Sequence, residues 1–171
     1  MNIKTIPFFL IAFVLITDQL SKWYVLEFII RQDGFPMPFM EWLNFDERLP
    51  FYGVQITSFF NIVMVWNEGI SFGLFSGMGG TQWPLTILSL AIVGFLFVWM
   101  FRSNSLFINL ILSLIIGGAL GNIWDRVRFG AVADFLDFHA FGYHWPAFNV
   151  ADSAITAGVV ILLIHNIFSK N

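Results

Sequence analysis

Apolar residues gather in four long stretches of the chain, and polar residues collect in the segments between them. A helix needs about 20 mostly apolar residues to cross the hydrocarbon core of a bilayer. The second and third stretches contain no charged residue, and the fourth has its single carboxylate, Asp152, at its start. This pattern predicts four transmembrane helices, at about residues 6–26, 84–101, 105–124 and 150–168.

The first connection, residues 27–83, is long and has a mixed pattern. Pro36 and Pro38 exclude a continuous helix there. Residues 39–43, which combine aromatic side chains with an acid, are typical of a segment that lies at the membrane interface.

The later part of this connection has the composition of β-strands. Residues 56–66 and 70–75 are rich in aromatic and β-branched side chains. Between them, Asn67, Glu68 and Gly69 favour a turn. We therefore expect a small β-hairpin over residues 56–75.

The composition agrees with a small membrane protein of one domain, residues 1–171. Hydrophobic residues make up 58% of the chain and charged residues 11%, against roughly 25% charged in an average soluble domain. Mean hydropathy is +0.79. The net charge is only -3 and the basic residues are scattered, so no nucleic-acid partner is expected.

The chain has no cysteine. This excludes disulfides, thiolate metal ligands and thiol nucleophiles, and it excludes attachment of lipid to a cysteine of the chain itself. It does not exclude action on proteins that carry such a lipid.

Charges in the short connections predict how the helices are oriented. Lys4, Arg102 and Lys170 lie near the N-terminus, in the turn after the second helix and at the C-terminus, and these three segments contain no acid. By the positive-inside rule all three are cytoplasmic. The 11 Asp and Glu residues then fall on the other side or at its boundary, so we expect extracytoplasmic chemistry.

Ionisable residues within a span need a partner or a function, because an acid at the centre of a bilayer costs about 2.5–3.5 kcal/mol on insertion scales. Asp18 and Lys22 lie four residues apart, beside Gln19, in the order that favours an ion pair. The simplest interpretation is a pair that reaches the membrane surface at the end of the first helix.

The end of the third predicted helix combines small residues with a polar face. Gly117 and Gly121 allow another helix to approach closely. Asn122, Asp125 and Arg126 share one face. The simplest interpretation is a helix end at which Asp125 contacts Arg126.

Two carboxylates flank the last two predicted helices on the same membrane side. Asp134 lies in a largely apolar stretch without an adjacent cation, and Asp152 falls in the first turn of the fourth helix, where Asn149 can cap it. Capping alone could account for Asp152. Because a short loop joins their segments, the carboxylates can also meet, share one proton and act on a peptide bond as in aspartic proteases.

Other interpretations fit the sequence less well. His139 and His144 lie in a loop without the helical spacing of a zinc site, and no Ser is placed with a Lys or His in a recognisable motif. A transporter or channel that relays protons usually carries its acids near the bilayer midplane, on broken or repeated helices. A purely structural membrane protein would leave the carboxylate pair without a purpose.

Four groups of residues, in order along the chain, resemble the motifs of the lipoprotein signal peptidases, also called type II signal peptidases. The third and fourth motifs are highly specific, whereas the first two are weak by themselves. One departure is the separation of Lys22 from Asn67, which is longer than usual by roughly a dozen residues. The matching motifs are Asp18-Gln19-x-x-Lys22, Asn67-x-Gly69-x-x-Phe72-Gly73, Gly118-Ala119-x-Gly121-Asn122-x-x-Asp125-Arg126-x-x-x-Gly130-x-Val132-x-Asp134-Phe135 and Phe148-Asn149-x-Ala151-Asp152-x-x-Ile155.

The resemblance implies an all-α protein of the bacterial plasma membrane, with four transmembrane helices and a small extracytoplasmic β-cradle. It implies an aspartic endopeptidase that removes the signal peptide from prolipoproteins, cutting just before a cysteine that carries diacylglycerol. The implied partners are these precursors and membrane lipid, and no metal or cofactor has an evident ligand set. The implied roles are catalysis by Asp134 and Asp152, substrate binding by Asn67, Asn122, Arg126 and Asn149, and structural support by Asp18, Lys22, Gly69, Gly118, Gly121 and Asp125.

Overall fold

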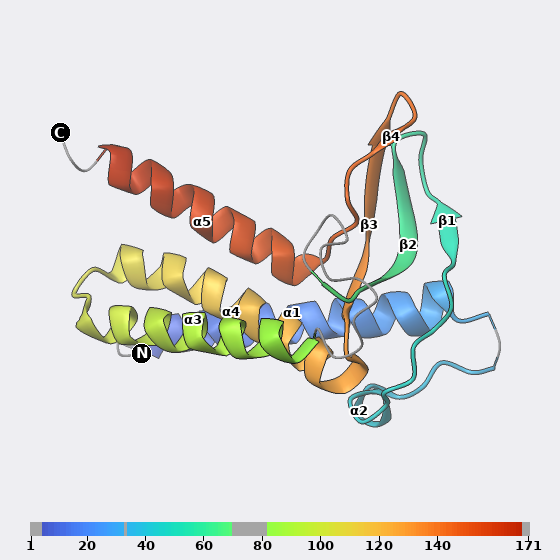
Figure 1. Cartoon of the computed structure of the whole chain (residues 1–171), viewed down its shortest axis with the longest axis horizontal. Coiled ribbons are helices and arrows are strands. Elements are labelled where there is room, and N and C mark those ends of the chain that lie inside the picture. Colours follow the sequence, from blue (N-terminus) through green and yellow to red (C-terminus); the bar gives the residue numbers. More distant parts are fainter. Residues whose placement is uncertain (1–4, 33, 70–81, 169–171) are drawn as a thin grey trace.

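The computed structural model describes residues 5–32, 34–69 and 82–168, which form four long helices with an antiparallel sheet at one end of the bundle (Figure 1). A π-helical segment, η2 (Val25–Ile30), continues the first long helix. All four long helices are apolar enough to cross a membrane, so the prediction of four transmembrane helices is confirmed. They are α1 (Ile6–Tyr24), α3 (Gln82–Arg102), α4 (Leu106–Phe129) and α5 (Val150–Phe168).

Two of the helices run further than the apolar pattern predicted. The first span extends through η2 to Ile30, and α4 extends to Phe129. In both cases charged residues interrupt the apolar run but find partners in the folded chain. Glu27, for example, is buried and accepts hydrogen bonds of 2.9 Å from two nitrogens of Arg31.

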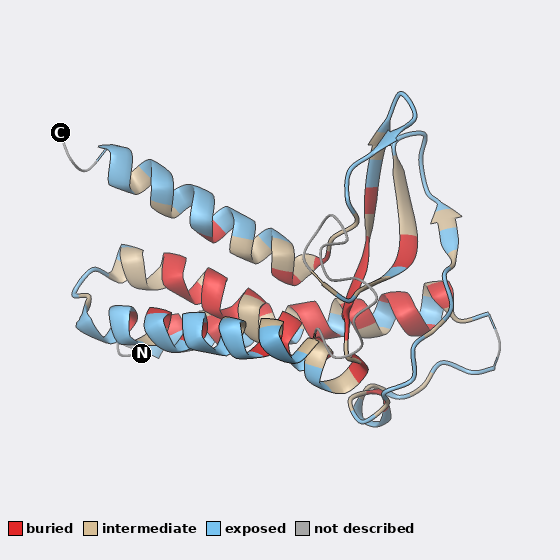
Figure 2. Cartoon of the chain, viewed as in Figure 1, coloured by how far each residue is buried: buried red, intermediate tan, exposed pale blue. Residues whose placement is uncertain are grey.

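Helix α4 is the centre of the bundle and packs against α1, α3 and α5. Leu112 and Ile116 on α4 are completely buried in this core. The outer faces of α3 and α5 instead present large apolar side chains such as Phe95 and Leu163 (Figure 2). Apolar outer faces are what helices surrounded by lipid tails require.

The sheet has the strand order β1-β2-β3-β4, with all neighbours antiparallel. The register of β2 against β3 is interrupted between Ile62 and Val65, where an irregularity shifts the pairing. Figure 1 shows these two strands running across the direction of the helices. The strands are β1 (Gly53–Gln55), β2 (Phe60–Asn67), β3 (Val132–Ala140) and β4 (Tyr143–His144).

The sheet differs from the predicted hairpin. Residues 70–75, the expected second strand, lie outside the described residues, and β2 pairs with β1 and β3 instead. The segment expected to be a loop around His139 contains β3, and His139 pairs with His144 of β4. Gly130 ends α4 with a φ of 69°, a left-handed conformation that glycine adopts without strain, and the chain turns there into β3.

The interfacial segment forms one helical turn, α2 (Phe39–Trp42), and packs under the sheet. Trp42 is completely buried. The guanidinium of Arg128, at the end of α4, lies 4.2 Å from the centre of the Trp42 ring and donates a hydrogen bond of 2.8 Å to the carbonyl of Phe45. Segment 39–45 is therefore tied to the same end of the bundle as the sheet.

Candidate active site

Asp134 of β3 and Asp152 of α5 are joined through Asn149. The Nδ2 of Asn149 donates a hydrogen bond of 2.7 Å to Oδ1 of Asp134. The backbone amide of Asn149 donates one of 3.3 Å to Oδ2 of Asp152, whose own amide donates one of 2.9 Å to Oδ1 of Asn149. This reciprocal capping of α5 places both carboxylates around one residue, Asn149, which binds Asp134 through its side chain and Asp152 through its backbone amide.

Two further amides complete the arrangement. Asn67, at the end of β2, donates from Nδ2 to Oδ2 of Asp134 at 3.0 Å. Asn122 of α4 donates from Nδ2 to Oδ1 of Asp152 at 2.7 Å. The structure thus brings together the two predicted carboxylates and three of the four residues expected to bind substrate.

The two carboxylates differ in exposure, and burial changes the acidity of Asp134. Asp134 is 1% exposed, whereas Asp152 is half-buried. Burial, together with the negative charge of Asp152, raises the pKa of Asp134 to about 7, against the opposing effect of the hydrogen bonds from Asn67 and Asn149. Asp134 can therefore hold a proton at neutral pH.

A buried ion triad lies behind the carboxylate pair. Lys22 Nζ is 2.7 Å from Oδ2 of Asp18 and 2.7 Å from Oδ2 of Asp125, and all three side chains are completely buried. The expected ion pair of Asp18 with Lys22 forms, but it is buried rather than exposed at a surface. The expected contact of Asp125 with Arg126 is wrong, because Asp125 pairs with Lys22. A lysine buried between two carboxylates is satisfied without water.

The triad fixes the backbone beside each carboxylate of the site. Asp18 Oδ1 accepts a hydrogen bond of 3.0 Å from the amide of Ala151, next to Asp152. Asp125 Oδ2 accepts one of 3.2 Å from the amide of Ala133, next to Asp134. Asp18 and Asp125 thus each hold a backbone amide next to one of the two carboxylates.

Gln19 also stabilises the buried ion triad. The sequence did not predict this role for Gln19. Its Nε2 donates hydrogen bonds of 3.0 Å to both Asp18 and Asp125. Its position beside Asp18 in the first motif was the available signal.

Glycines allow the elements of the site to approach closely. A Cβ on Gly118 would lie 2.4 Å from the carbonyl oxygen of Ala151, and one on Gly121 would lie 2.5 Å from Oδ2 of Asp18. Gly69 has a different function, since its amide donates a hydrogen bond of 3.2 Å to Oδ1 of Asn67 and so orients that side chain. Phe72 and Gly73 of the same motif lie outside the described residues.

Arg126 is half-buried on α4 beside the carboxylates. Its Nη1 lies 3.4 Å from the carbonyl oxygen of Asn122, and its buried Nε has no hydrogen-bond partner within the described chain. The charges of Asp152, Asp125 and Asp134 all act on its guanidinium. Its five donors are thus only partly used, which leaves it able to bind an oxygen-rich ligand.

Comparisons with known proteins agree on one family. A family model described as signal peptidase (SPase) II matches residues 10–168. The lipoprotein signal peptidase of Anaplasma marginale is 37% identical over 163 residues, which cover 95% of this chain and 85% of that protein. That of Cupriavidus necator is 38% identical over 154 residues, covering 88% and 85%. A bacterial membrane enzyme solved by the in meso method is similar with a TM-score of 0.69 and 30% identity, covering 96% of this chain and 89% of that one.

Proposed function

Since the chain belongs to the signal peptidase II family, whose members are aspartic endopeptidases that remove signal peptides from prolipoproteins, we propose that Asp134 and Asp152 are its catalytic pair. The observation that carries this proposal is the arrangement of the two carboxylates around Asn149, one buried and one half-buried. Such unequal environments separate the acidities of two carboxyl groups, so that one serves as acid and the other as base.

The steps of peptide-bond hydrolysis follow from the different environments of Asp134 and Asp152. Asp152 acts as the base and takes a proton from water, and the water oxygen attacks the scissile carbonyl carbon while Asp134 gives its proton to the carbonyl oxygen. In the next step Asp152 passes its proton to the leaving nitrogen, the C–N bond breaks, and Asp134 recovers a proton from the hydroxyl group. Both carboxyl groups then return to their starting states.

The remaining polar groups support substrate binding in this proposal. Asn67, Asn122 and Asn149 hold the carboxylates, and we assign them to binding of the peptide backbone beside these carboxylates. Arg126 has unused donors for carbonyl oxygens. A fixed guanidinium near the developing negative charge also stabilises the tetrahedral intermediate.

The membrane brings the substrate to this site. A signal peptide is apolar and already lies in the bilayer, and a diacylglyceryl group holds the modified cysteine at the interface. We place the site at the extracytoplasmic face of the plasma membrane, with cleavage just before that cysteine. The charges of the short connections support this orientation.

The decisive experiment replaces each carboxylate with its amide. We expect Asp134→Asn and Asp152→Asn each to lower cleavage of a lipid-modified precursor in detergent by at least about 1,000-fold, because an amide cannot exchange the required proton. Asp46→Asn, which changes an exposed acid outside the site, is the matched control and should cleave at the normal rate. Near-normal cleavage by either site variant would rule out the pair.

A further inference from the structure

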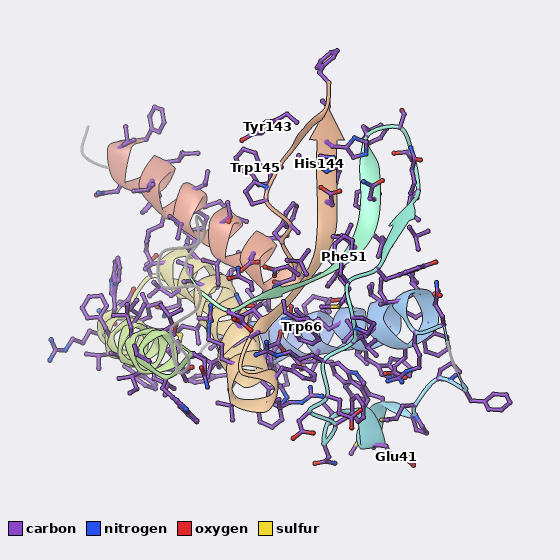
Figure 3. All side chains as sticks on the ribbon, turned by 45° about the vertical axis from the view of Figure 1, so that its right-hand side comes forward. Glu41, Phe51, Trp66, Tyr143, His144 and Trp145 are labelled. Atoms are coloured by element: carbon purple, nitrogen blue, oxygen red, sulfur yellow. The ribbon has the colours of Figure 1, made fainter. Side chains whose placement is uncertain are left out.

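Segment 39–45 belongs to the long first connection of the chain and lies beside the end of α4 (Figure 1). Within it, Trp42 is completely buried, whereas the side chain of Glu41 points away from the helices (Figure 3). The segment therefore presents one face to the bundle and the other to its surroundings. What it does for the site depends on the residues that its inner face holds.

Arg128 is the residue that this segment holds. Its guanidinium lies 4.2 Å from the centre of the Trp42 ring and 4.4 Å from that of Phe129. The same guanidinium donates hydrogen bonds to the carbonyls of Trp42 and Phe45, the second at 2.8 Å. A planar guanidinium that rests on aromatic rings and binds fixed acceptors has little freedom to move. Segment 39–45 thus sets the position of Arg128.

The guanidinium of Arg128 also reaches Gln19 in α1. Its Nη1 donates a hydrogen bond of 3.4 Å to Oε1 of Gln19, which is 5% exposed. The Nε2 of the same amide donates to Asp18 and Asp125 of the buried ion triad. An amide has one accepting oxygen and one donating nitrogen. A donor at the oxygen therefore keeps the nitrogen turned toward the two carboxylates.

Charge gives Arg128 a second link to the triad. When Asp18 and Asp125 are both ionised, Lys22 balances only one of their two negative charges. An unbalanced charge inside a protein is costly. Arg128 brings a further positive charge to the other side of Gln19, and the charge of Asp125 acts on its guanidinium.

The triad connects this arrangement to the carboxylate pair. Asp18 and Asp125 bind the backbone amides of Ala151 and Ala133, next to the two carboxylates. We propose that Arg128 is a positioning residue for the carboxylate pair, and that segment 39–45 serves cleavage by holding Arg128 against Gln19. The inference rests on the proposed function, because it concerns the geometry of the carboxylates assigned to catalysis.

The test is a kinetic double-mutant cycle on the full chain in detergent, with a lipid-modified precursor as substrate. Arg128→Gln should lower kcat about tenfold and leave KM within about twofold, because a displaced catalytic group slows the chemical step without removing a substrate contact. Gln19→Leu should also lower kcat. In the Gln19→Leu background, Arg128→Gln should add less than about twofold, because both changes break the same connection.

Two further variants separate this route from a general loosening of the helix end. Trp42→Leu removes the ring under Arg128 and should lower kcat in the same direction. Arg48→Gln is the matched control, because Arg48 also donates to a carbonyl at the end of α4, that of Phe129 at 2.7 Å, and lies 5.8 Å from the centre of the Trp66 ring. We expect it to lower the temperature of thermal unfolding and to leave kcat unchanged.

Three results would each overturn the inference. They are a normal kcat in Arg128→Gln, effects that multiply fully in the double variant, and an equal loss of kcat in Arg48→Gln. If Arg128→Gln does not fold, Arg128→Lys takes its place in the cycle, since lysine keeps the charge but cannot bind Gln19 and the carbonyls of segment 39–45 with one planar group. Asp134→Asn tests the proposed function separately, because there cleavage should disappear although Arg128 and Gln19 are in place.

Discussion

At the scale of single residues, the protonation of Asp134 makes the protein sensitive to pH near neutrality. Its pKa rises from 3.8 to about 7 on folding, so the folded chain binds this proton more tightly than the unfolded chain. The stability gained is complete below about pH 4 and is lost as the pH rises to about 7. Cleavage should likewise fall as the pH rises above about 7, because the acid loses its proton.

The variant Asp134→Asn isolates this effect. Between pH 4 and pH 8, the free energy of unfolding in detergent should depend less on pH in the variant than in the unchanged protein. We expect its change over this range to be smaller by roughly 2–4 kcal/mol. The introduced amide must also face the donors of Asn67 and Asn149, which lowers stability at every pH. The slope of the free energy of unfolding against pH is therefore the quantity to compare. Equal slopes in the two proteins would show that Asp134 ionises normally.

Arg126 provides a second test at this scale. Its guanidinium does not pair with Asp125, which is held by Lys22, so its geometry rather than its charge should matter. We expect Arg126→Lys to lower kcat/KM about tenfold or more, because a point charge replaces the planar five-donor group. Arg126→Ala serves as the comparison for precursor cleavage and thermal stability. Full activity in the Lys variant, with destabilisation only in the Ala variant, would return Arg126 to a structural role.

At the scale of elements, the contact between α4 and α5 determines where Asp152 lies. A Cβ on Gly118 would come within 2.4 Å of the Ala151 carbonyl, so Gly118→Ala must push α5 away. We expect a loss of about 1–3 kcal/mol in stability and at least a tenfold loss of cleavage, measured by thermal unfolding and precursor turnover.

Gly94 in α3 is the matched control, because a Cβ there would meet nothing within 4 Å. Gly94→Ala should raise stability by about 0.5–1 kcal/mol through helix propensity alone and leave cleavage unchanged. If both alanine variants behaved alike, close packing of α4 on α5 would not be what positions Asp152.

The sequence predicted the helices better than the strands, for a physical reason. A transmembrane helix satisfies its own backbone, so a local apolar run is enough to reveal it. Strand β3 depends on pairing with β2, whose partner residues are far away in the chain, as in the pair Asn67 and Val132. An irregular register further obscures the alternation of β2 between Ile62 and Val65.

The carboxylate pair was predictable because few polar residues lie beside the spans, so each one demanded an explanation. The buried ion triad behind the pair could not be predicted from the sequence. Lys22 fits an ion pair with Asp18 by spacing alone, and only the packing of α1 on α4 adds Asp125 as its second partner.

At the scale of the whole molecule, the fold makes a consistent prediction about topology. The turn between α3 and α4 and the end of α5 lie at the opposite end of the helices from the sheet (Figure 1). Reporter fusions after Ser103 and after Lys170 should therefore report cytoplasm, whereas fusions within residues 32–50 and at Gly142 should report the outside. An extracytoplasmic signal at Ser103 would reverse the orientation and move the site to the cytoplasmic face.

The hydrogen bond from the Ala151 amide to Asp18 has a consequence for biosynthesis. It joins α1 to α5, and the groups that hold Asp134 and Asp152 come from β2, α4 and the residue before α5. A ribosome delivers these segments in order, and domains fold as their parts emerge. A nascent chain that has inserted three helices thus has neither its second carboxylate nor the amide that joins the pair. With Asp134 and Asp152 as the proposed catalytic pair, we expect newly made chains to gain activity only when α5 enters the bilayer.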